Sequence, residues 1–380
     1  MTVVFATNYF NHHQACLARE LDRLTDHHFF FLETMPMTQE RRALGWKSDS
    51  QPDYVIHSYE PNQAKRCREL IRDADAVIWG SCPFSMVLPR LLAGKLTFLY
   101  SERIFKEGKS GFGFWGRGVK YLLKLGLFQR NHYLLASSAY AAADYNLLGL
   151  FRGRSYRWGY FPEVLAYDPD ALISAKQPNS LLWVGRMIPY KHPEAAVEAA
   201  RRLKQDGLPF RMKMVGCGTL EDSLRQQIQM EQLEDCVELT GSMPASQVRR
   251  EMEAASLFLY TADRGEGWGA VLNESMNSCC AVVACRAIGA APYLVEDGEN
   301  GLLYPEGDGD ALYEKTKNLL EHPEEARRLG KNAYETLQNP WNAAHAAECL
   351  IRLMESILSS APISAPECGP CSIAPILSDE

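Results

Sequence analysis

The sequence has 380 residues, of which 46% are hydrophobic and 23% are charged. These values are ordinary for a folded globular protein, and they exclude a disordered chain, a collagen-like fibre and a small disulfide scaffold. The length predicts two or three domains, and no uninterrupted apolar run of about 18 residues predicts a membrane span. The first residues lack the basic start and the cleavage site of a signal peptide. We therefore expect a cytoplasmic protein.

The charge is distributed unevenly along the chain. The net charge is −7, which argues against a general nucleic-acid binder. Between Arg103 and His132, however, seven basic residues accompany a single acid, Glu107. This window carries +6 and the remainder carries −13. The seven basic residues are Arg103, Lys106, Lys109, Arg117, Lys120, Lys124 and Arg130.

Short apolar runs alternate with longer amphipathic runs in both halves of the chain. Strands are predicted at Thr2–Thr7, His28–Glu33, Ala76–Gly80, Leu96–Tyr100, Tyr133–Ala136, Leu181–Gly185, Arg211–Val215, Val237–Thr240, Leu257–Tyr260 and Ala281–Ala284. Helices are predicted at His13–Leu24, Asn62–Asp73, Glu194–Lys204, Leu220–Met230, Ala245–Ala254, Ala270–Ser278 and Trp341–Leu358. This alternation is typical of parallel sheets covered on both faces. We therefore predict an α/β protein of two Rossmann-like domains, joined through the irregular stretch Phe151–Ser180.

The first candidate site is a loop with two cations. Arg186 and Lys191 lie five residues apart after Gly185, where a predicted strand ends. Parallel sheets bind ligands beyond the carboxyl ends of their strands. The planar fork of arginine and the point charge of lysine both suit phosphate oxygens. The pair predicts an anion site, and two solvated surface cations are the alternative.

The second candidate site is a glycine-rich loop that leads from a predicted strand into a predicted helix. Gly267 and Gly269 allow the backbone to approach a ligand closely, and the helix N-terminus favours a negative group such as a diphosphate. Glu266 and Glu274 are placed to accept hydrogen bonds from sugar hydroxyls. The alternative is that Glu266 caps the helix and that Glu274 is exposed.

Two further glycine turns follow strands of the same half. One contains Gly216 and Gly218, and the other contains Gly289. Glycine is common in such loops, so the prediction rests on their combination with the two sites above.

Taken in order, these motifs resemble a known family: the retaining glycosyltransferases of family 4, also called glycosyl transferases group 1. The resemblance covers about residues 180 to 305, and the N-terminal half matches in pattern only. The matching residues are Gly185-Arg186 with Lys191, Val215-Gly216-Cys217-Gly218, Leu239-Thr240-Gly241, Glu266 with Glu274, Gly289, and Asp297-Gly298-Glu299-Asn300-Gly301-Leu302-Leu303.

The resemblance implies a GT-B fold, in which two Rossmann-like domains face each other across a cleft. It places an acceptor domain at residues 1–165 and a nucleotide-sugar donor domain at residues 175–340, with the helix at 341–358 packing back on the acceptor domain. Residues 359–380 are rich in proline and serine and predict a flexible tail. A metal or redox role for the C-x-x-C of Cys368 and Cys371 is the alternative there.

The resemblance also implies roles for individual residues. Arg186 and Lys191 would bind the donor diphosphate and stabilise it as it leaves. Glu266 would contact the donor sugar, and Glu274 would hold the ribose hydroxyls. The amides of Gly267, Trp268 and Gly269 would support the phosphates, and the turn Gly216–Gly218 would lie near the nucleoside. No metal is expected, since protein cations and helix dipoles replace it, and the leaving phosphate would act as the base.

The N-terminal half departs from the family at two positions. A glycine pair usually follows the first strand, and here that place holds Asn11, His12 and His13. His13 would bond the diphosphate or the acceptor, and helix capping by Asn11 with both histidines exposed is the alternative. A histidine often follows a later strand, and here Glu102 stands there. It would bond the acceptor or orient Arg103, unless the two form an ordinary ion pair.

The basic stretch has two interpretations. Aromatic residues such as Trp115 alternate with the basic residues, and Gly118 to Arg130 is predicted to form a basic amphipathic helix. Such a helix can lie on an anionic membrane with Arg117, Lys120 and Lys124 at the headgroups. It would then contact a membrane or a lipid-linked acceptor. The alternative is a helix packed on the sheet with a solvated basic face.

We therefore predict a retaining hexosyltransferase that moves a sugar from a UDP- or GDP-sugar to a glycan or lipid-linked glycan, in surface polysaccharide or glycolipid assembly. Peripheral contact with the inner face of the membrane is part of this prediction. A non-catalytic nucleotide-sugar-binding module and a nucleotide-sugar 2-epimerase are the alternatives. The sequence leaves the sugar, the base, the acceptor and the oligomeric state open.

Overall fold

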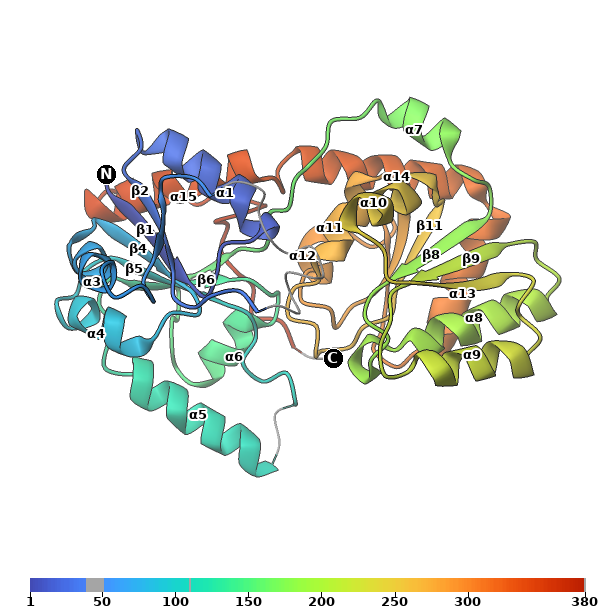
Figure 1. The fold of residues 1–380 in the computed structure, drawn as a ribbon, viewed down its shortest axis with the longest axis horizontal. Coiled ribbons are helices and arrows are strands. Elements are labelled where there is room, and N and C mark those ends of the chain that lie inside the picture. The colour runs from blue at the N-terminus through green and yellow to red at the C-terminus, as the bar shows by residue number, and fades with distance from the viewer. Residues whose placement is uncertain (39–50, 109–110, 379–380) are drawn as a thin grey trace. The chain divides into compact units, whose positions relative to one another are not determined.

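The computed structural model describes residues 1–38, 51–108 and 111–378. The chain divides into two units. Unit 1 comprises residues 1–163 and the segment that begins at Pro340, and unit 2 comprises Val164–Asn339. Each unit contains one parallel sheet between layers of helices (Figure 1). Both are therefore Rossmann-like units of the α/β class.

Unit 1 contains a seven-stranded sheet with the order β3-β2-β1-β4-β5-β6-β7. Its strands are β1 Val3–Thr7, β2 Phe29–Glu33, β3 Val55–His57, β4 Ala76–Trp79, β5 Thr97–Ser101, β6 His132–Ala136 and β7 Ser155–Arg157. Its helices are α1 His12–Leu24, α3 Ala64–Asp73, α4 Phe84–Leu92, α5 Gly111–Leu125, α6 Ala141–Leu147 and α15 Ala343–Leu358. Helix α15 packs against α1, so the chain returns to unit 1 after completing unit 2.

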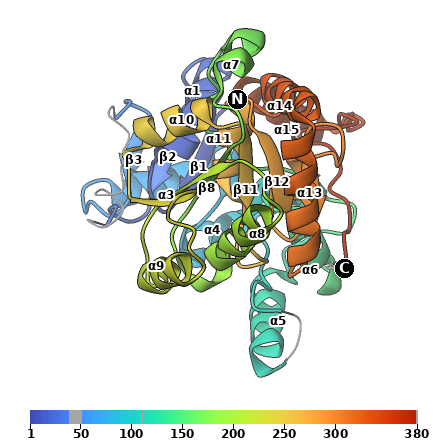
Figure 2. The same cartoon turned by 90° about the vertical axis from the view of Figure 1, so that its right-hand side faces the viewer.

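Unit 2 contains a six-stranded sheet with the order β10-β9-β8-β11-β12-β13. Its strands are β8 Ser180–Val184, β9 Arg211–Val215, β10 Val237–Gly241, β11 Leu257–Tyr260, β12 Ala281–Cys285 and β13 Leu302–Tyr304. Its helices are α7 Pro169–Ala175, the 3-10 turn η1 Pro189–Lys191, α8 Pro193–Gln205, α9 Glu221–Met230, α10 Ala245–Ala254, α11 Ala270–Asn277, α12 Ala291–Leu294, α13 Gly309–Glu321 and α14 Pro323–Gln338. Helix α8 contacts α9 and α13, and α11 contacts α10 and α14 (Figure 2).

Each sheet has a point at which its winding reverses. In unit 1 the reversal lies between β1 and β4, and in unit 2 it lies between β8 and β11. The loops that follow these neighbouring strands leave toward opposite faces of the sheet, and ligands bind in the crevice that results. The loop after β8 contains Arg186 and Lys191, and the loop after β11 contains Glu266. The fold thus brings both predicted loops of the C-terminal half to one reversal point.

The ten predicted strands are all present, and three short strands were missed. Strands β1, β4, β11 and β12 are buried along their whole length, which explains their continuous apolar sequences. The missed strands β3, β7 and β13 have three residues each. Three residues are too few for a periodic pattern, and their pairing with longer neighbours defines them as strands.

The basic helix begins earlier than the sequence predicts. The prediction was Gly118 to Arg130, whereas α5 spans Gly111–Leu125. Its glycines do not prevent the helix, because packing on unit 1 offsets their weak helix propensity. The ring of Phe114 contacts that of Phe105 with centroids 4.6 Å apart. Lys109, which belongs to the basic stretch, lies outside the described residues.

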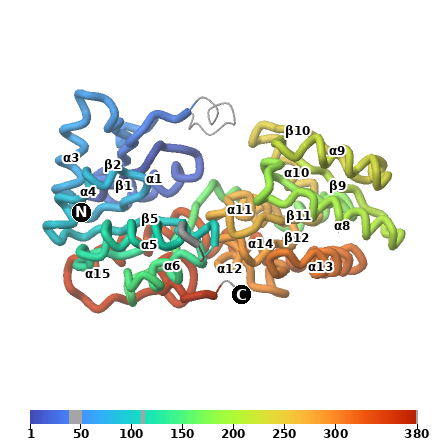
Figure 3. Tube along the Cα trace, turned by 90° about the horizontal axis from the view of Figure 1, so that it is seen from below, coloured from blue at the N-terminus to red at the C-terminus, as the bar shows by residue number. Residues whose placement is uncertain are grey.

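The predicted flexible tail is wrong for residues 371–374. The Cys371 amide donates a hydrogen bond to the Arg157 carbonyl, and the Arg157 amide donates one to the Ser372 carbonyl. Ile373 therefore forms an antiparallel bridge with Tyr156 of β7. The reason is that β7 is an edge strand, whose unpaired backbone groups the tail satisfies. In Figure 3 the red C-terminal segment runs along unit 1.

The two cysteines of the C-x-x-C lie in different environments. Cys368 is exposed, whereas Cys371 is 1% exposed. Burial raises the pKa of the Cys371 thiol well above its usual value, so this thiol stays protonated. A buried, protonated thiol is a poor metal ligand and a poor nucleophile.

Glycines allow the loops at the carboxyl edge of unit 2 to pack closely. Gly216 has φ +139°, and a Cβ atom there would collide with the Gly185 carbonyl oxygen. Gly269 has φ +94°, and a Cβ atom there would collide with the Tyr260 hydroxyl. These two glycines therefore determine how the loops after β9 and β11 sit at the candidate site.

We predict that a chain shortened to end at Pro366 loses stability in unit 1. Removal of the paired segment exposes the β7 edge and the apolar surface beneath Cys371 and Ala374, at a cost of about 2–4 kcal/mol. Thermal unfolding would measure this loss. A chain that ends at Pro375 keeps the paired segment and is the control. Equal unfolding midpoints for the two shortened chains would show that the tail contributes nothing.

We also predict that Gly269→Ala destabilises unit 2 by about 2–4 kcal/mol, because the added methyl meets the Tyr260 hydroxyl while φ stays positive. Gly307→Ala is the matched control, since Gly307 has φ +78° and open space around its Cα. The control should lose only about 1 kcal/mol. Denaturant unfolding compares the two, and equal losses would contradict the argument from close packing.

Candidate functional site

A lysine, a glutamate and a tyrosine meet at the reversal point of unit 2. Lys191 Nζ forms an ion pair with Glu266 Oε2, and the two side chains are 11% and 14% exposed. The Tyr260 hydroxyl donates a hydrogen bond to Glu266 Oε2 at 3.0 Å. Lys191 Nζ lies 3.4 Å from the same hydroxyl. The lysine and the glutamate, which were predicted from separate motifs, therefore form one polar cluster.

Tyr260 was missed by the sequence analysis. It is the last residue of β11 and is 2% exposed, and the sequence shows it only as the end of an apolar strand. Burial, followed by the nearby Glu266 carboxylate, raises the pKa of its hydroxyl well above the usual value. The hydroxyl therefore stays protonated and donates to Glu266 at any physiological pH.

The loop after β11 also fixes the backbone of the loop after β8. The Thr261 hydroxyl donates to the Lys191 carbonyl at 2.7 Å, and the Asp263 amide donates to the Tyr190 carbonyl at 2.9 Å. Both bonds act on the short η1 turn that ends at Lys191. The position of the lysine is thus determined by backbone contacts, in addition to its ion pair.

The two cations of the first motif lie in different environments. Lys191 is buried in the cluster, so the alternative of a solvated surface cation is wrong for it. Arg186 is exposed, and its guanidinium donates to the Tyr190 hydroxyl at 2.9 Å. Lys191 therefore has both of its polar partners inside the cluster, whereas Arg186 extends from the loop with one hydrogen bond to a neighbouring residue.

The N-terminus of α11 lies directly after the glycine-rich loop. Its capping position is Gly269, and no side chain among the described residues caps it, so the alternative that Glu266 caps this helix is wrong. Trp268 is fully buried, and its indole nitrogen donates to Asn273 Oδ1 at 2.9 Å. Only the backbone of Trp268 is left for a ligand. Glu274 is half-buried in the second turn of α11.

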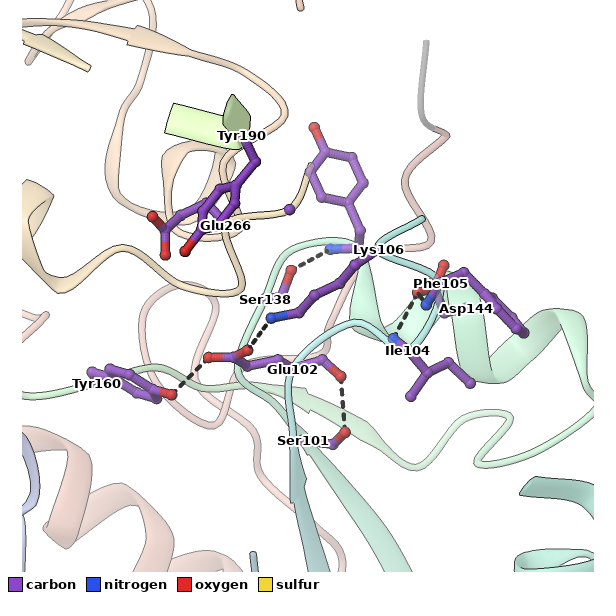
Figure 4. Close-up of polar contacts among 12 residues, drawn as sticks. Ser101, Glu102, Ile104, Phe105, Lys106, Ser138, Asp144, Tyr160, Tyr190 and Glu266 are labelled. Atoms are coloured by element: carbon purple, nitrogen blue, oxygen red, sulfur yellow. Dashed lines mark hydrogen bonds and ion pairs between the residues drawn. The ribbon is translucent and has the colours of Figure 1, made fainter. Parts of the chain in front are cut away.

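In unit 1, Glu102 follows β5 and is held by two neighbours. Its Oε1 accepts a hydrogen bond from the Tyr160 hydroxyl at 2.6 Å, and its Oε2 pairs with Lys106 at 2.6 Å (Figure 4). The alternative of a Glu102–Arg103 ion pair is therefore wrong. Arg103 turns inward instead and lies 3.7 Å from Asp144, with both side chains buried.

The Asp144 carboxylate explains why Arg103 points inward. It accepts hydrogen bonds from the Ile104 and Phe105 amides, each at 3.0 Å (Figure 4). A buried carboxylate needs such partners together with a cation. The loop after β5 therefore bonds to Asp144 through two backbone amides and contacts it through Arg103. Glu102 remains at the carboxyl end of β5.

His13 lies in the first turn of α1. The Asn11 side chain accepts a hydrogen bond from the His13 amide at 3.0 Å, so the helix capping by Asn11 that formed part of the alternative is confirmed. Both His12 and His13 are half-buried, which contradicts the expectation that they are exposed. The His13 ring stacks near Tyr160 with centroids 6.1 Å apart, so it shares a neighbour with Glu102.

A polar cluster around Glu33 was likewise not predicted from the sequence. The Glu33 carboxylate accepts a hydrogen bond from the Phe10 amide at 2.5 Å and lies 2.6 Å from His57 Nδ1. It thereby ties the loop after β1 to β3. The available signal was an acidic residue at the carboxyl end of a buried apolar strand.

The predicted membrane-facing residues all belong to α5 and divide into two pairs. Trp115 and Lys120 are exposed. Arg117 pairs with Glu107 at 3.0 Å. Lys124 packs 4.6 Å above the Trp79 ring and is half-buried. Lys124 is therefore committed to unit 1, in contrast to the prediction that it faces lipid headgroups.

Comparison with known proteins connects this geometry to a family. Residues 168–336 match the family model of glycosyl transferases group 1. The chain is 28% identical over 237 residues to WcaL of Escherichia coli (strain K12), whose name places it provisionally among colanic acid biosynthesis glycosyltransferases. That match covers 61% of this chain and 58% of WcaL. The chain is also 39% identical over 141 residues to the amylovoran biosynthesis glycosyltransferase AmsK of Erwinia amylovora. This match covers 36% of this chain and 34% of AmsK. The chain thus spans less than two thirds of each relative.

Solved structures establish the fold over most of the chain. Anabaena HepE in complex with UDP and glucose matches with a TM-score of 0.66 at 14% identity, covering 94% of this chain and all of HepE. TarM matches with a TM-score of 0.68 at 11% identity, covering 93% and 99%. At such identities the likeness concerns the fold alone. The chain has the GT-B fold, and its residues 168–336 match the family model of glycosyl transferases group 1.

Proposed function

We propose that this protein is a retaining glycosyltransferase that moves a sugar from a nucleotide-diphosphate donor, UDP or GDP, to a glycan or lipid-linked glycan. The observation that carries the proposal is the cluster of Lys191, Glu266 and Tyr260 at the reversal point of unit 2. The names of WcaL and AmsK, which refer to polysaccharide biosynthesis, support a role in polysaccharide or glycolipid assembly. HepE was crystallised with UDP and glucose, which supports a uridine nucleotide donor.

Donor binding follows from the charges at this site. A diphosphate would compete with Glu266 for Lys191, and Arg186 is exposed at the same loop to contact a second phosphate oxygen. The uncapped N-terminus of α11 offers backbone amides and the positive end of a helix dipole. The amides of Gly267, Trp268 and Gly269 belong to this anion site in our proposal. No metal ion is needed, because these groups supply the positive charge.

We assign the Glu266 and Glu274 carboxylates to hydrogen bonds with hydroxyl groups of the sugar donor. When Lys191 turns to the diphosphate, the Glu266 carboxylate keeps the Tyr260 hydroxyl as a donor and accepts hydrogen bonds from the transferred sugar. Glu274, one turn into α11, accepts hydrogen bonds from the ribose. Gly216 and Gly218 hold the loop after β9 close to the loop after β8, where the nucleoside would bind.

The reaction breaks the bond between the anomeric carbon and the donor phosphate oxygen, and it forms a bond from the acceptor oxygen to the same face of that carbon. The leaving phosphate accepts the acceptor's proton. Lys191 and Arg186 stabilise the negative charge that develops on the diphosphate, which is commonly the largest catalytic contribution. On unit 1, Glu102 and His13 are our candidates for acceptor contacts. Glu102 follows β5 and His13 lies in the first turn of α1, and both have Tyr160 as a neighbour.

We predict that Lys191→Ala and Glu266→Gln each lower turnover at least about 100-fold, since each removes a charge that acts on the donor. The assay incubates the protein with a panel of UDP- and GDP-sugars and measures nucleotide release, with and without a cell lipid extract as acceptor. Mass spectrometry of the products then identifies the acceptor.

The matched control is Lys204→Ala. Lys204 lies on α8 and pairs with Asp235 at 2.6 Å, in an ordinary surface ion pair. This variant should retain wild-type turnover. Wild-type turnover in a folded Lys191→Ala or Glu266→Gln variant would refute the site assignment. Donor binding by the wild type without release of nucleotide from any donor would favour a non-catalytic binding module.

A further inference from the structure

Helix α5 has an apolar face that no part of the described chain covers. Trp115 is 69% exposed and Leu123 is 77% exposed, and Leu127, just beyond the helix end, is 88% exposed. Val119 and Leu122 are also exposed. Figures 1 and 2 show α5 at the periphery of unit 1. Clusters of large exposed apolar side chains usually mark an interaction surface.

Helical spacing places these residues on one side of α5. Residues 115, 119, 122 and 123 follow the three- and four-residue steps that share a helix face. We call this set, together with Leu127, the outer face of α5. The opposite side holds Phe114 and Tyr121, whose rings pack on Phe105 and Tyr145, and Leu125, which is 1% exposed. Packing on unit 1 therefore accounts for the inner side alone.

The charged side chains of residues 108–143 are all basic, and the acid just before this segment, Glu107, is paired with Arg117. The sequence contains no aspartate or glutamate from Gly108 to Ala143. Lys120 and Arg130 are exposed, whereas Arg117 and Lys124 are engaged with Glu107 and the Trp79 ring. Among the described residues of this segment, Lys120 and Arg130 are therefore the basic side chains that are exposed and not engaged by those two partners.

An exposed apolar face beside basic side chains favours an anionic lipid surface over a second copy of this chain as the partner of α5. A second copy of the chain would place like charges opposite each other, with no acid in the segment to compensate. An anionic lipid surface offers acyl chains for the apolar side chains and phosphates for Lys120 and Arg130. An exposed tryptophan is typical of the boundary between headgroups and acyl chains. No helix in the described part of the chain is long and apolar enough to cross a bilayer, so the contact would be peripheral.

We propose that the outer face of α5 inserts into one leaflet of an anionic bilayer. The boundary between lipid headgroups and acyl chains takes up the side chains of Trp115, Leu123 and Leu127. The lipid phosphates are contacted by Lys120 and Arg130. The axis of α5 lies in the plane of the membrane. This proposal concerns lipid binding only, and it holds or fails independently of the donor chemistry proposed above.

The test is co-sedimentation of the full-length protein with two kinds of vesicles, phosphatidylglycerol mixed with phosphatidylcholine, and phosphatidylcholine alone. The wild type should bind the anionic vesicles more strongly. Leu123→Ser with Leu127→Ser should weaken this binding at least about tenfold, because two large apolar side chains lose their lipid contact. Lys120→Gln should weaken binding to anionic vesicles and reduce its sensitivity to salt.

The matched control is Met230→Ser with Ile376→Ser. These side chains are 75% and 57% exposed and lie outside α5, so the control should bind vesicles like the wild type. A second measurement follows Trp115 directly: brominated lipids should quench its fluorescence, and Trp115→Phe should lose that quenched component. This measurement keeps the proposal testable should the leucine variant fold poorly.

Three outcomes would overturn the proposal. The first is a wild type that binds neither kind of vesicle, and the second is equal binding by the leucine variant and the control. The third is self-association of the wild type through the two leucines without vesicle binding, which would make the outer face a contact between copies. Donor hydrolysis is measured without vesicles, so a loss of lipid binding is distinguishable from a failure of the proposed activity.

Discussion

The ion pair between Lys191 and Glu266 is the interaction on which the proposed donor site of unit 2 depends. Its two side chains come from loops that follow neighbouring strands, and both are mostly buried. A charge in such a place requires a partner, because removing one member of a buried pair commonly costs about 3–5 kcal/mol. We infer that each group holds the other in position until an anionic ligand replaces the Glu266 carboxylate as the partner of Lys191. The neutral Tyr260 hydroxyl then remains as the partner of the carboxylate.

The two units use one architecture for different purposes. Both sheets are parallel and reverse their winding at a central pair of strands. In unit 2 the reversal point carries a cation that suits phosphate. In unit 1 the strand ends carry Glu102 and Glu33, each already bonded to neighbours. Carboxylates with a fixed orientation suit hydroxyl groups, which agrees with our assignment of the acceptor to unit 1.

The sheets of both units and the site loops of unit 2 could largely be predicted from the sequence, because the local hydrophobic pattern and the local structure agree there. Strands β1, β4, β11 and β12 are buried along their whole length and have apolar sequences, and α11 begins directly after Gly269. Lys191 and Glu266 were both predicted to be site residues from their separate motifs. Their ion pair could not be foreseen, since it depends on β8 and β11 being neighbours in the sheet.

The remaining errors have a common physical origin in contacts between distant parts of the chain. The tail is ordered at Cys371 because β7 has an open edge, and the partner of Arg103 is Asp144, which lies on α6. Lys124 was assigned to lipid because it lies in a basic stretch, but the Trp79 ring is within reach on the inner side of α5. Composition reveals that such residues are present, and only the fold determines which partner each one meets.

The most direct test of the central claim is calorimetric titration of nucleoside diphosphates and monophosphates into the wild type, Lys191→Ala and Lys204→Ala. If Lys191 binds the diphosphate, the wild type and Lys204→Ala prefer UDP over UMP, or GDP over GMP, by at least about tenfold, equivalent to about 1.4 kcal/mol. Lys191→Ala should lose most of that preference. An undiminished preference for the diphosphate in a folded Lys191→Ala variant would contradict the account.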